Sequence, residues 1–102
     1  MAVVNLTNEN FDKEATEYKG TVLIDFWAPW CMPCRMLSPI VDEVSEEVVQ
    51  VKVTKVNVDE QERLAARFGV MNIPTLIVLR DGVEVNRSVG VIPKDDIIKM
   101  LD

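Results

Sequence analysis

Cys31 and Cys34 are the two cysteines of this 102-residue chain, and they stand three positions apart. They follow an apolar run that is typical of a buried strand. Pro33, between them, fits the first turn of a helix because it lacks an N–H group that would be unpaired there. Two thiols at this spacing can close into a disulfide and open again with little backbone movement. The pattern therefore indicates thiol redox chemistry.

Two other interpretations of the cysteine pair stay open from the residues alone. A zinc site prefers four ligands, and in a chain without histidine two of them would have to be carboxylates. The other alternative is an inert structural disulfide, although disulfide-stabilised secreted scaffolds usually hold more than one bridge. The residues favour the redox interpretation over both.

The two sulfurs are expected to play different parts. Cys31 should stand just before the helix, where unpaired backbone N–H groups and the helix dipole stabilise a thiolate over a thiol. We therefore expect Cys31 to be the attacking nucleophile. Cys34 lies one turn into the helix and should be more buried. It is expected to resolve the mixed disulfide and release the reduced partner.

Composition limits the class of protein. A net charge of −6 argues against nucleic acid as the main partner and favours a monomer. With 48% hydrophobic residues, 102 residues are enough for one core, so we expect a single domain over 1–102. We find neither a signal-peptide pattern nor an apolar run near the ~20 residues that a membrane span needs. The expected location is cytoplasmic, without a membrane partner.

Strands and helices are expected to alternate along the chain. Apolar runs and a hairpin turn at Asp81-Gly82 predict strands at residues 3–6, 22–27, 51–58, 75–80 and 83–89. Apolar residues at helical spacing predict helices at 8–18, at 33–48 and at 93–101. A further helix is predicted to carry Leu64, Ala65 and Phe68 and to end at Gly69. The order βαβαβαββα predicts an α/β fold with a central mixed five-stranded sheet flanked by four helices.

Two details of the helices are also predicted. Pro39 lies inside the long helix and should kink it. Asp59 and Glu62 have the spacing of a capping box, which would start the following helix.

Asp25 and Lys55 are polar residues that strand alternation places inward. Asp25 shares a face with Leu23 and Trp27, so burial should raise the pKa of its carboxyl and suit it to proton transfer. Lys55 shares a face with Val53, and Asp25 on a neighbouring strand is its natural partner. The alternatives are that Asp25 reaches solvent at a strand end and that the strand shifts phase at Lys55.

Several motifs together resemble the thioredoxin family. They are Trp30-Cys31-x-Pro33-Cys34 after the second strand, Ile73-Pro74-Thr75 before the fourth, Phe26-Trp27-Ala28, the segment 55–59, Asp81-Gly82 and Gly90. Their order and spacing cover nearly the whole chain. The resemblance implies the thioredoxin fold and a protein-disulfide reductase that uses the Cys31–Cys34 dithiol without a bound cofactor or metal.

The resemblance also implies roles for individual residues. Asp25, tuned by Lys55, would accept the proton of Cys34, and Met32 and Pro33 would tune the redox potential. The Ile73–Pro74 bond would be cis and face the cysteines, although an ordinary trans proline is the commoner case. Substrates would dock on an apolar rim formed by Trp30, Met32, Met71, Ile73, Pro74, Gly90 and Val91. We assign Trp27, Met36 and Met100 to the core.

The implied partners are disulfide-containing target proteins and a flavin-dependent, NADPH-using thioredoxin reductase. Met32 departs from the family, which usually has glycine there, and the pair Met71-Asn72 is also unusual. We expect these changes to tune partner choice or redox potential; drift at tolerant positions is the alternative. Two other functions stay open: a dedicated electron carrier for one pathway, and a binding subunit that does not use its thiols.

Overall fold

The computed structural model describes residues 3–102 and contains a five-stranded mixed sheet in the order β1-β3-β2-β4-β5. The strands are β1 (Val4–Asn5), β2 (Thr21–Trp27), β3 (Lys52–Asn57), β4 (Thr75–Arg80) and β5 (Val83–Val89). β3 runs parallel to β1 and β2, whereas β4 is antiparallel to β2 and β5 is antiparallel to β4. The predicted α/β order and the mixed sheet are thereby confirmed.

Strand β2 is the central strand of the sheet, and its residues are covered on both faces. Residues 22–26 are all buried, which explains why this run is almost continuously apolar. Its neighbours are β3 on one side and β4 on the other, and the register pairs Asp25 with Lys55 of β3 and with Leu76 of β4. A polar residue at position 25 therefore lies deep in the molecule.

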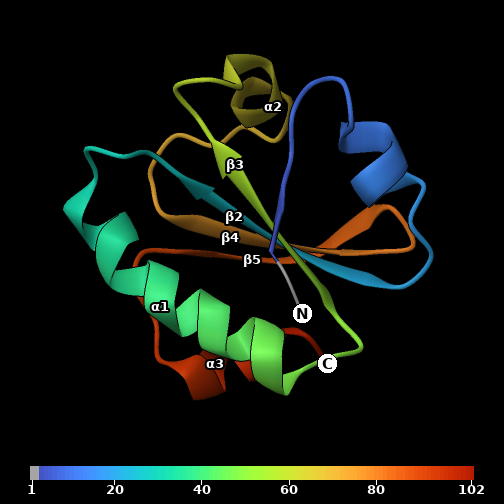
Figure 1. The fold of residues 1–102 in the computed structure, drawn as a ribbon, viewed down its shortest axis with the longest axis vertical. Coiled ribbons are helices and arrows are strands. Elements are labelled where there is room, and N and C mark those ends of the chain that lie inside the picture. Colours follow the sequence, from blue (N-terminus) through green and yellow to red (C-terminus); the bar gives the residue numbers. More distant parts are fainter. Residues whose placement is uncertain (1–2) are drawn as a thin grey trace.

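The helices cover both faces of the sheet, as Figure 1 shows. On one face, α1 (Met32–Glu47) and α3 (Lys94–Met100) bury an apolar cluster that includes Leu37, Val41 and Ile97. On the other face, a short π-helix, η1 (Asp12–Thr16), and α2 (Glu62–Arg67) cover a second cluster that includes Phe11 and Leu64. Among residues 3–102, no helix has both the length and the apolar character needed to cross a membrane.

The first helical segment is shorter than predicted. The helix expected over residues 8–18 is the single π-helical stretch Asp12–Thr16, in which the Glu17 N–H reaches back to the Asp12 carbonyl. Before it, Thr7 and Asn10 cap each other: the Asn10 N–H donates to Thr7 Oγ1 and the Thr7 N–H donates to Asn10 Oδ1. The apolar spacing identified the buried face correctly but overestimated the length.

The predicted capping box at Asp59 and Glu62 is wrong. Helix α2 starts at Glu62 itself, its N-cap is Gln61, and no side chain caps it. The carboxylate of Asp59 instead accepts a hydrogen bond from the indole of Trp30. Gly69, with φ of 64°, follows the end of α2 as predicted.

The remaining local predictions agree with the structure in their main points. Helix α1 continues through Pro39 to Glu47, and the kink expected at Pro39 stays a prediction. Asp81 and Gly82, with φ of 52° and 84°, form the hairpin turn between β4 and β5. The final helix is α3, one residue shorter at each end than predicted, with Pro93 as its N-cap.

Candidate redox site

Cys31 and Cys34 form a disulfide at the start of α1, with their Cα atoms 5.3 Å apart. Cys31 is the N-cap residue of α1, and its Sγ accepts a hydrogen bond from the Cys34 N–H at 3.2 Å. This N–H is one of the first-turn donors that an α-helix cannot pair internally. The same donor would stabilise a negative charge on Cys31 Sγ once the disulfide is reduced.

The two sulfurs differ more in surroundings than in exposure. Cys31 is 4% exposed and Cys34 is 2% exposed, so the predicted difference in burial is small in the disulfide state. Cys31 Sγ lies 3.8 Å from the Ile73 carbonyl oxygen, across the loop that precedes β4. Cys34 faces inward, where it lines a cavity with Asp25. The two cysteines are therefore distinguished by the N-cap position of Cys31 and not by their exposed fractions.

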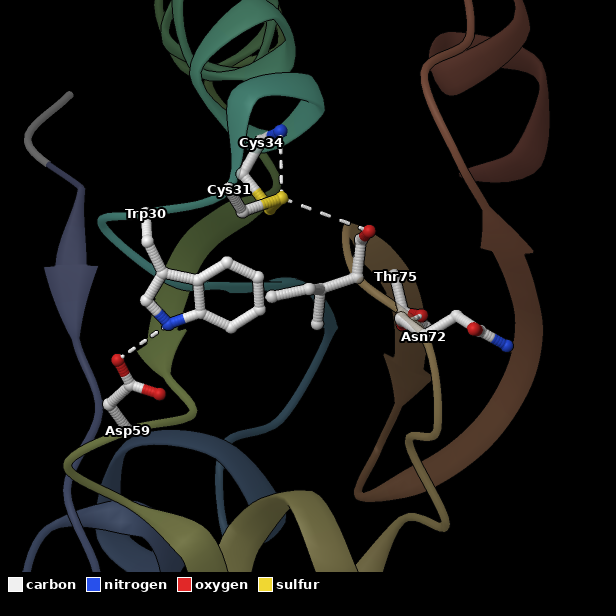
Figure 2. Close-up of a disulfide and its surroundings, with 7 residues drawn as sticks. Trp30, Cys31, Cys34, Asp59, Asn72 and Thr75 are labelled. Carbon is white, nitrogen blue, oxygen red and sulfur yellow. Dashed lines mark hydrogen bonds between the residues drawn. A yellow bond between two sulfur atoms is a disulfide. The ribbon is translucent and has the colours of Figure 1, made fainter.

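The loop before β4 lies against the disulfide, as Figure 2 shows. The Ile73–Pro74 peptide bond is cis, as the resemblance to thioredoxins implies. Thr75 Oγ1 donates to the Asn72 carbonyl, and the Gly90 N–H donates to the Pro74 carbonyl at 2.8 Å. These bonds hold the loop and the end of β5 together next to Cys31.

Apolar side chains are exposed around the disulfide. The exposed fractions are 68% for Trp30, 64% for Met32, 89% for Met71 and 40% for Val91, while Ile73 is half-buried against the cysteines. Pro33 is exposed, Pro74 is buried and Gly90 is half-buried. An exposed apolar group of this kind in a small domain is typical of an interaction site.

The three residues that the sequence assigns to the core differ in their burial. Met100 is buried, as predicted. Met36 is 64% exposed, so its assignment to the core is wrong. It lies one helical turn after Met32 and shares its outward face of α1. Trp27 is half-buried and packs against the cluster of Ala28, Cys31 and Cys34.

The orientation of Trp30 depends on a contact that no sequence pattern predicts. Its Nε1 donates to Asp59 Oδ2 at 2.9 Å, the bond drawn from the indole ring in Figure 2. Asp59 lies 29 positions further along the chain, after β3. The bond fixes the direction of a large exposed ring that would otherwise rotate freely.

Asp25 is a buried carboxyl without a direct partner. It is 1% exposed, and neither of its oxygens has a hydrogen-bond partner among residues 3–102. Burial raises the pKa of Asp25 to about 7; the positive charge of Lys55 opposes this rise and the negative charge of Asp42 adds to it. The expected inward position is confirmed, and the alternative of a solvent-exposed aspartate is wrong.

Lys55 points inward but does not bind Asp25, so the predicted direct partnership is wrong. Its Nζ donates to Ser38 Oγ at 2.6 Å and lies 3.8 Å from Asp42 Oδ1. Both groups belong to α1, which packs over this part of the sheet. Lys55 therefore acts on Asp25 through its charge and not through a hydrogen bond.

A cavity of about 100 Å³ joins these groups to the disulfide. Its lining consists of Asp25, Trp27, Cys34, Arg35, Ser38 and Lys55. A water molecule needs at least ~10–15 Å³ and two or more polar partners, and this space offers both. The cavity can therefore connect the Cys34 sulfur with the Asp25 carboxyl through water.

Comparisons with known proteins agree with this geometry. The family model described as Thioredoxin matches residues 2–102. The chain belongs to the thioredoxin family. It is 45% identical to the thioredoxin of Bacillus subtilis over 100% of this chain and 97% of that protein. It is 46% identical to thioredoxin 1 of Synechococcus elongatus over 95% and 92%, and 43% identical to the thioredoxin of Staphylococcus haemolyticus over 100% and 97%.

Family membership and the paired cysteines together give the biochemical class. This thioredoxin-family chain is a thiol–disulfide oxidoreductase, with protein-disulfide reductase activity and disulfide-containing proteins as its targets. Its Cys31-Met32-Pro33-Cys34 segment is the redox-active disulfide. Within residues 3–102, no three His, Cys, Asp or Glu side chains cluster as a metal site would require.

The sequence interpretation missed Ser38, Asp59 and the outward position of Met36. Ser38 follows Cys34 by four residues, so helical spacing could have placed both on one face of α1. The same spacing relates Met36 to Met32. No local pattern connects Asp59 with Trp30, because their contact depends on how β3 lies beside the end of β2.

Removal of the Asp25 carboxyl should change how stability depends on pH. Asp25 has a pKa of about 7 when folded against an ordinary value of 3.8, so the folded protein keeps a proton that the unfolded chain releases between these values. The wild type therefore loses stability as pH rises from about 4 to about 7. We expect the stability of Asp25→Ala relative to wild type to increase over that range by up to about 4 kcal/mol.

The measurement is urea unfolding of the oxidised wild type and variant from pH 4 to pH 8. Subtraction removes the titration of all other groups, and the cavity that alanine leaves adds only an offset that does not depend on pH. A difference that stays constant across this range would show that Asp25 is not a buried acid with a raised pKa.

Proposed function

We propose that Cys31 carries out the first step of disulfide reduction. Its thiolate attacks one sulfur of a target disulfide, so that a Cys31–target disulfide forms, the target S–S bond breaks, and one target thiolate leaves. Support comes from the N-cap position of Cys31 and the Cys34 N–H directed at its sulfur. This single contact is the observation on which the proposal rests.

Cys34 completes the reaction. Its thiol gives a proton to the Asp25 carboxylate through water in the shared cavity, and the resulting thiolate attacks Cys31 Sγ. The Cys31–Cys34 disulfide forms and the second target thiolate is expelled, so two electrons pass from the chain to the target. A carboxyl with a pKa of about 7 suits this task, because it is neither fully ionised nor fully protonated near neutral pH.

Lys55 and the residues between the cysteines tune these steps. The charge of Lys55 opposes the effect of burial on the pKa of Asp25 and so keeps the carboxyl within reach of neutral pH. Met32 and Pro33 occupy the first turn of α1, between the two sulfurs, where they act on the redox potential.

The target docks on the apolar rim around the disulfide. Trp30, Met32, Met71 and Val91 are exposed there, and the cis Ile73–Pro74 loop presents the backbone beside Cys31. An extended target segment along this backbone would place its disulfide at Cys31, with apolar contacts that do not require one sequence. Ile73, Pro74 and Gly90 shape this part of the surface.

The chain returns to its dithiol form by accepting two electrons from a partner. We propose a thioredoxin reductase that uses flavin and NADPH, a cytoplasmic location where thiols stay reduced, and a monomer as the working form. The net charge of −6 and the close similarity to bacterial thioredoxins support these assignments.

A dedicated carrier for one pathway is the second candidate. Met32 and Met71 are both strongly exposed on the docking rim, and both depart from the common family pattern. Methionine side chains adapt to an apolar partner, so these two can favour one partner over others.

Single cysteine variants test the order of the two steps. Cys34→Ser should lose turnover and accumulate a mixed disulfide between Cys31 and a target, because the resolving thiol is missing. Cys31→Ser should lose turnover without accumulating such an adduct. The measurement is reduction of a protein disulfide with a reductase, followed by mass spectrometry of the trapped species.

The wild type with both cysteines serves as the reference in that experiment. Equal trapping by the two variants would contradict the assigned roles. A double serine variant that keeps full biological function would instead favour the thiol-independent binding subunit.

Met32→Gly tests the part of the docking rim that departs from the family. Loss of this exposed side chain should lower kcat/KM for a reductase or target by about fourfold, the effect of burying the equivalent of one methylene group at about 0.8 kcal/mol. The control is Val49→Gly, which removes an equally exposed apolar side chain beyond the other end of α1. An unchanged redox potential together with unchanged kinetics would remove Met32 from the proposal.

A further inference from the structure

Ser38 is the closest partner of a partly buried cation at the redox site. It belongs to α1, one turn after Cys34, and lines the same cavity as Cys34 and Asp25. Its Oγ accepts a hydrogen bond from Lys55 Nζ at 2.6 Å. The Lys55 side chain is only 14% exposed, so an acceptor at this distance largely decides where its ammonium group lies.

The sheet places Lys55 directly beside Asp25. The two residues are register partners on the adjacent parallel strands β2 and β3, and both line the cavity. Neither oxygen of Asp25 has a hydrogen-bond partner among the described residues. Without another acceptor, an ammonium group in this position would be drawn to the vacant carboxylate.

We propose that Ser38 is a positioning residue that holds the Lys55 ammonium group off Asp25, and thereby keeps Asp25 able to accept the proton of Cys34. The inference rests on the proton transfer assigned to Asp25 under the proposed function. The serine hydroxyl has the right chemistry, because it accepts from the ammonium group without carrying a charge that would compete with the carboxyl.

All charged groups that face Asp25 fit this arrangement. Helix α1 supplies Arg35 at the cavity and Asp42 near Lys55, and β3 supplies Lys55 itself. On the other side, β4 places the apolar Leu76 opposite Asp25. No other charged side chain lines the cavity within residues 3–102.

Asp42 is the other possible destination for Lys55 when Ser38 is removed. Its side chain is 55% exposed, and it already lies 3.8 Å from Lys55 Nζ without forming a hydrogen bond. An exposed carboxylate is screened by water, so a tighter pair there gains little. A buried, unpaired carboxylate gains much more from a counter-charge, because the dielectric around it is low. Lys55 should therefore turn toward Asp25.

The direct test measures the pKa of Asp25 by NMR of its carboxyl carbon. The oxidised protein is used, because neither cysteine titrates in it. Ser38→Ala should lower the pKa of Asp25 by about one unit, the size of effect that an approaching opposite charge produces. Ser38→Thr keeps the hydroxyl and should restore the wild-type value. The matched control is Ser45→Ala, a buried serine of α1 that bonds the Asp42 carbonyl and does not line the cavity.

A second pair of variants shows whether the effect passes through Lys55. In a Lys55→Met background, Ser38→Ala should leave the pKa of Asp25 unchanged, because no ammonium group remains to move. An Asp25 pKa that stays constant or rises in Ser38→Ala would overturn the proposal. A decrease that persists in the Lys55→Met background would overturn it as well.

The kinetic readout separates this inference from the proposed function. In Ser38→Ala, the pH midpoint of the Cys34 attack on a mixed disulfide should fall together with the pKa of Asp25. Asp25→Asn should abolish this midpoint. If the pKa of Asp25 falls in Ser38→Ala while the kinetics are independent of Asp25, the position of Lys55 is upheld and the proton-acceptor role of Asp25 is refuted.

Discussion

The hydrogen bond from the Cys34 N–H to Cys31 Sγ depends on the position of the N-terminus of α1, and the rest of the site is built around that position. The helix must begin just after β2 ends, so that its first-turn donors point at the sulfur. A buried central strand and a helix packed on one face of the sheet through Leu37 and Val41 fix that point. The same packing places Cys34 at the cavity that Asp25 also lines. The residues that we propose as nucleophile, resolving thiol and proton acceptor are thus positioned by one junction between a strand and a helix.

Asp25 conflicts with the stability of the core that surrounds it. A buried carboxyl without a hydrogen-bond partner is destabilising when ionised, and here burial outweighs the opposing charge of Lys55. The cavity beside it also forgoes packing contacts. Close packing elsewhere in the two apolar clusters offsets these costs. The local loss of stability is what gives the site an acid that can exchange a proton near neutral pH.

Most of the fold could be predicted because its signals are local. The apolar run of β2, the helical spacing of α1 and the Asp81-Gly82 turn each depend on neighbouring residues. Two of the errors arose where distant residues compete for one group. Asp59 has the spacing of a helix cap but binds Trp30, and Lys55 faces Asp25 but binds Ser38. In both cases a residue from another element lies closer than the sequence neighbour or strand partner, and only the packed structure shows this.

The order of the two proposed steps depends on the difference between the two sulfurs in the reduced protein, and alkylation kinetics measure that difference directly. The rates of the two thiols with a small alkylating reagent are followed by mass spectrometry between pH 5 and pH 9. Cys31 should react roughly tenfold faster than Cys34 near neutral pH, because the N-terminus of α1 stabilises its thiolate. Two thiols that are equally slow over this range would contradict the account.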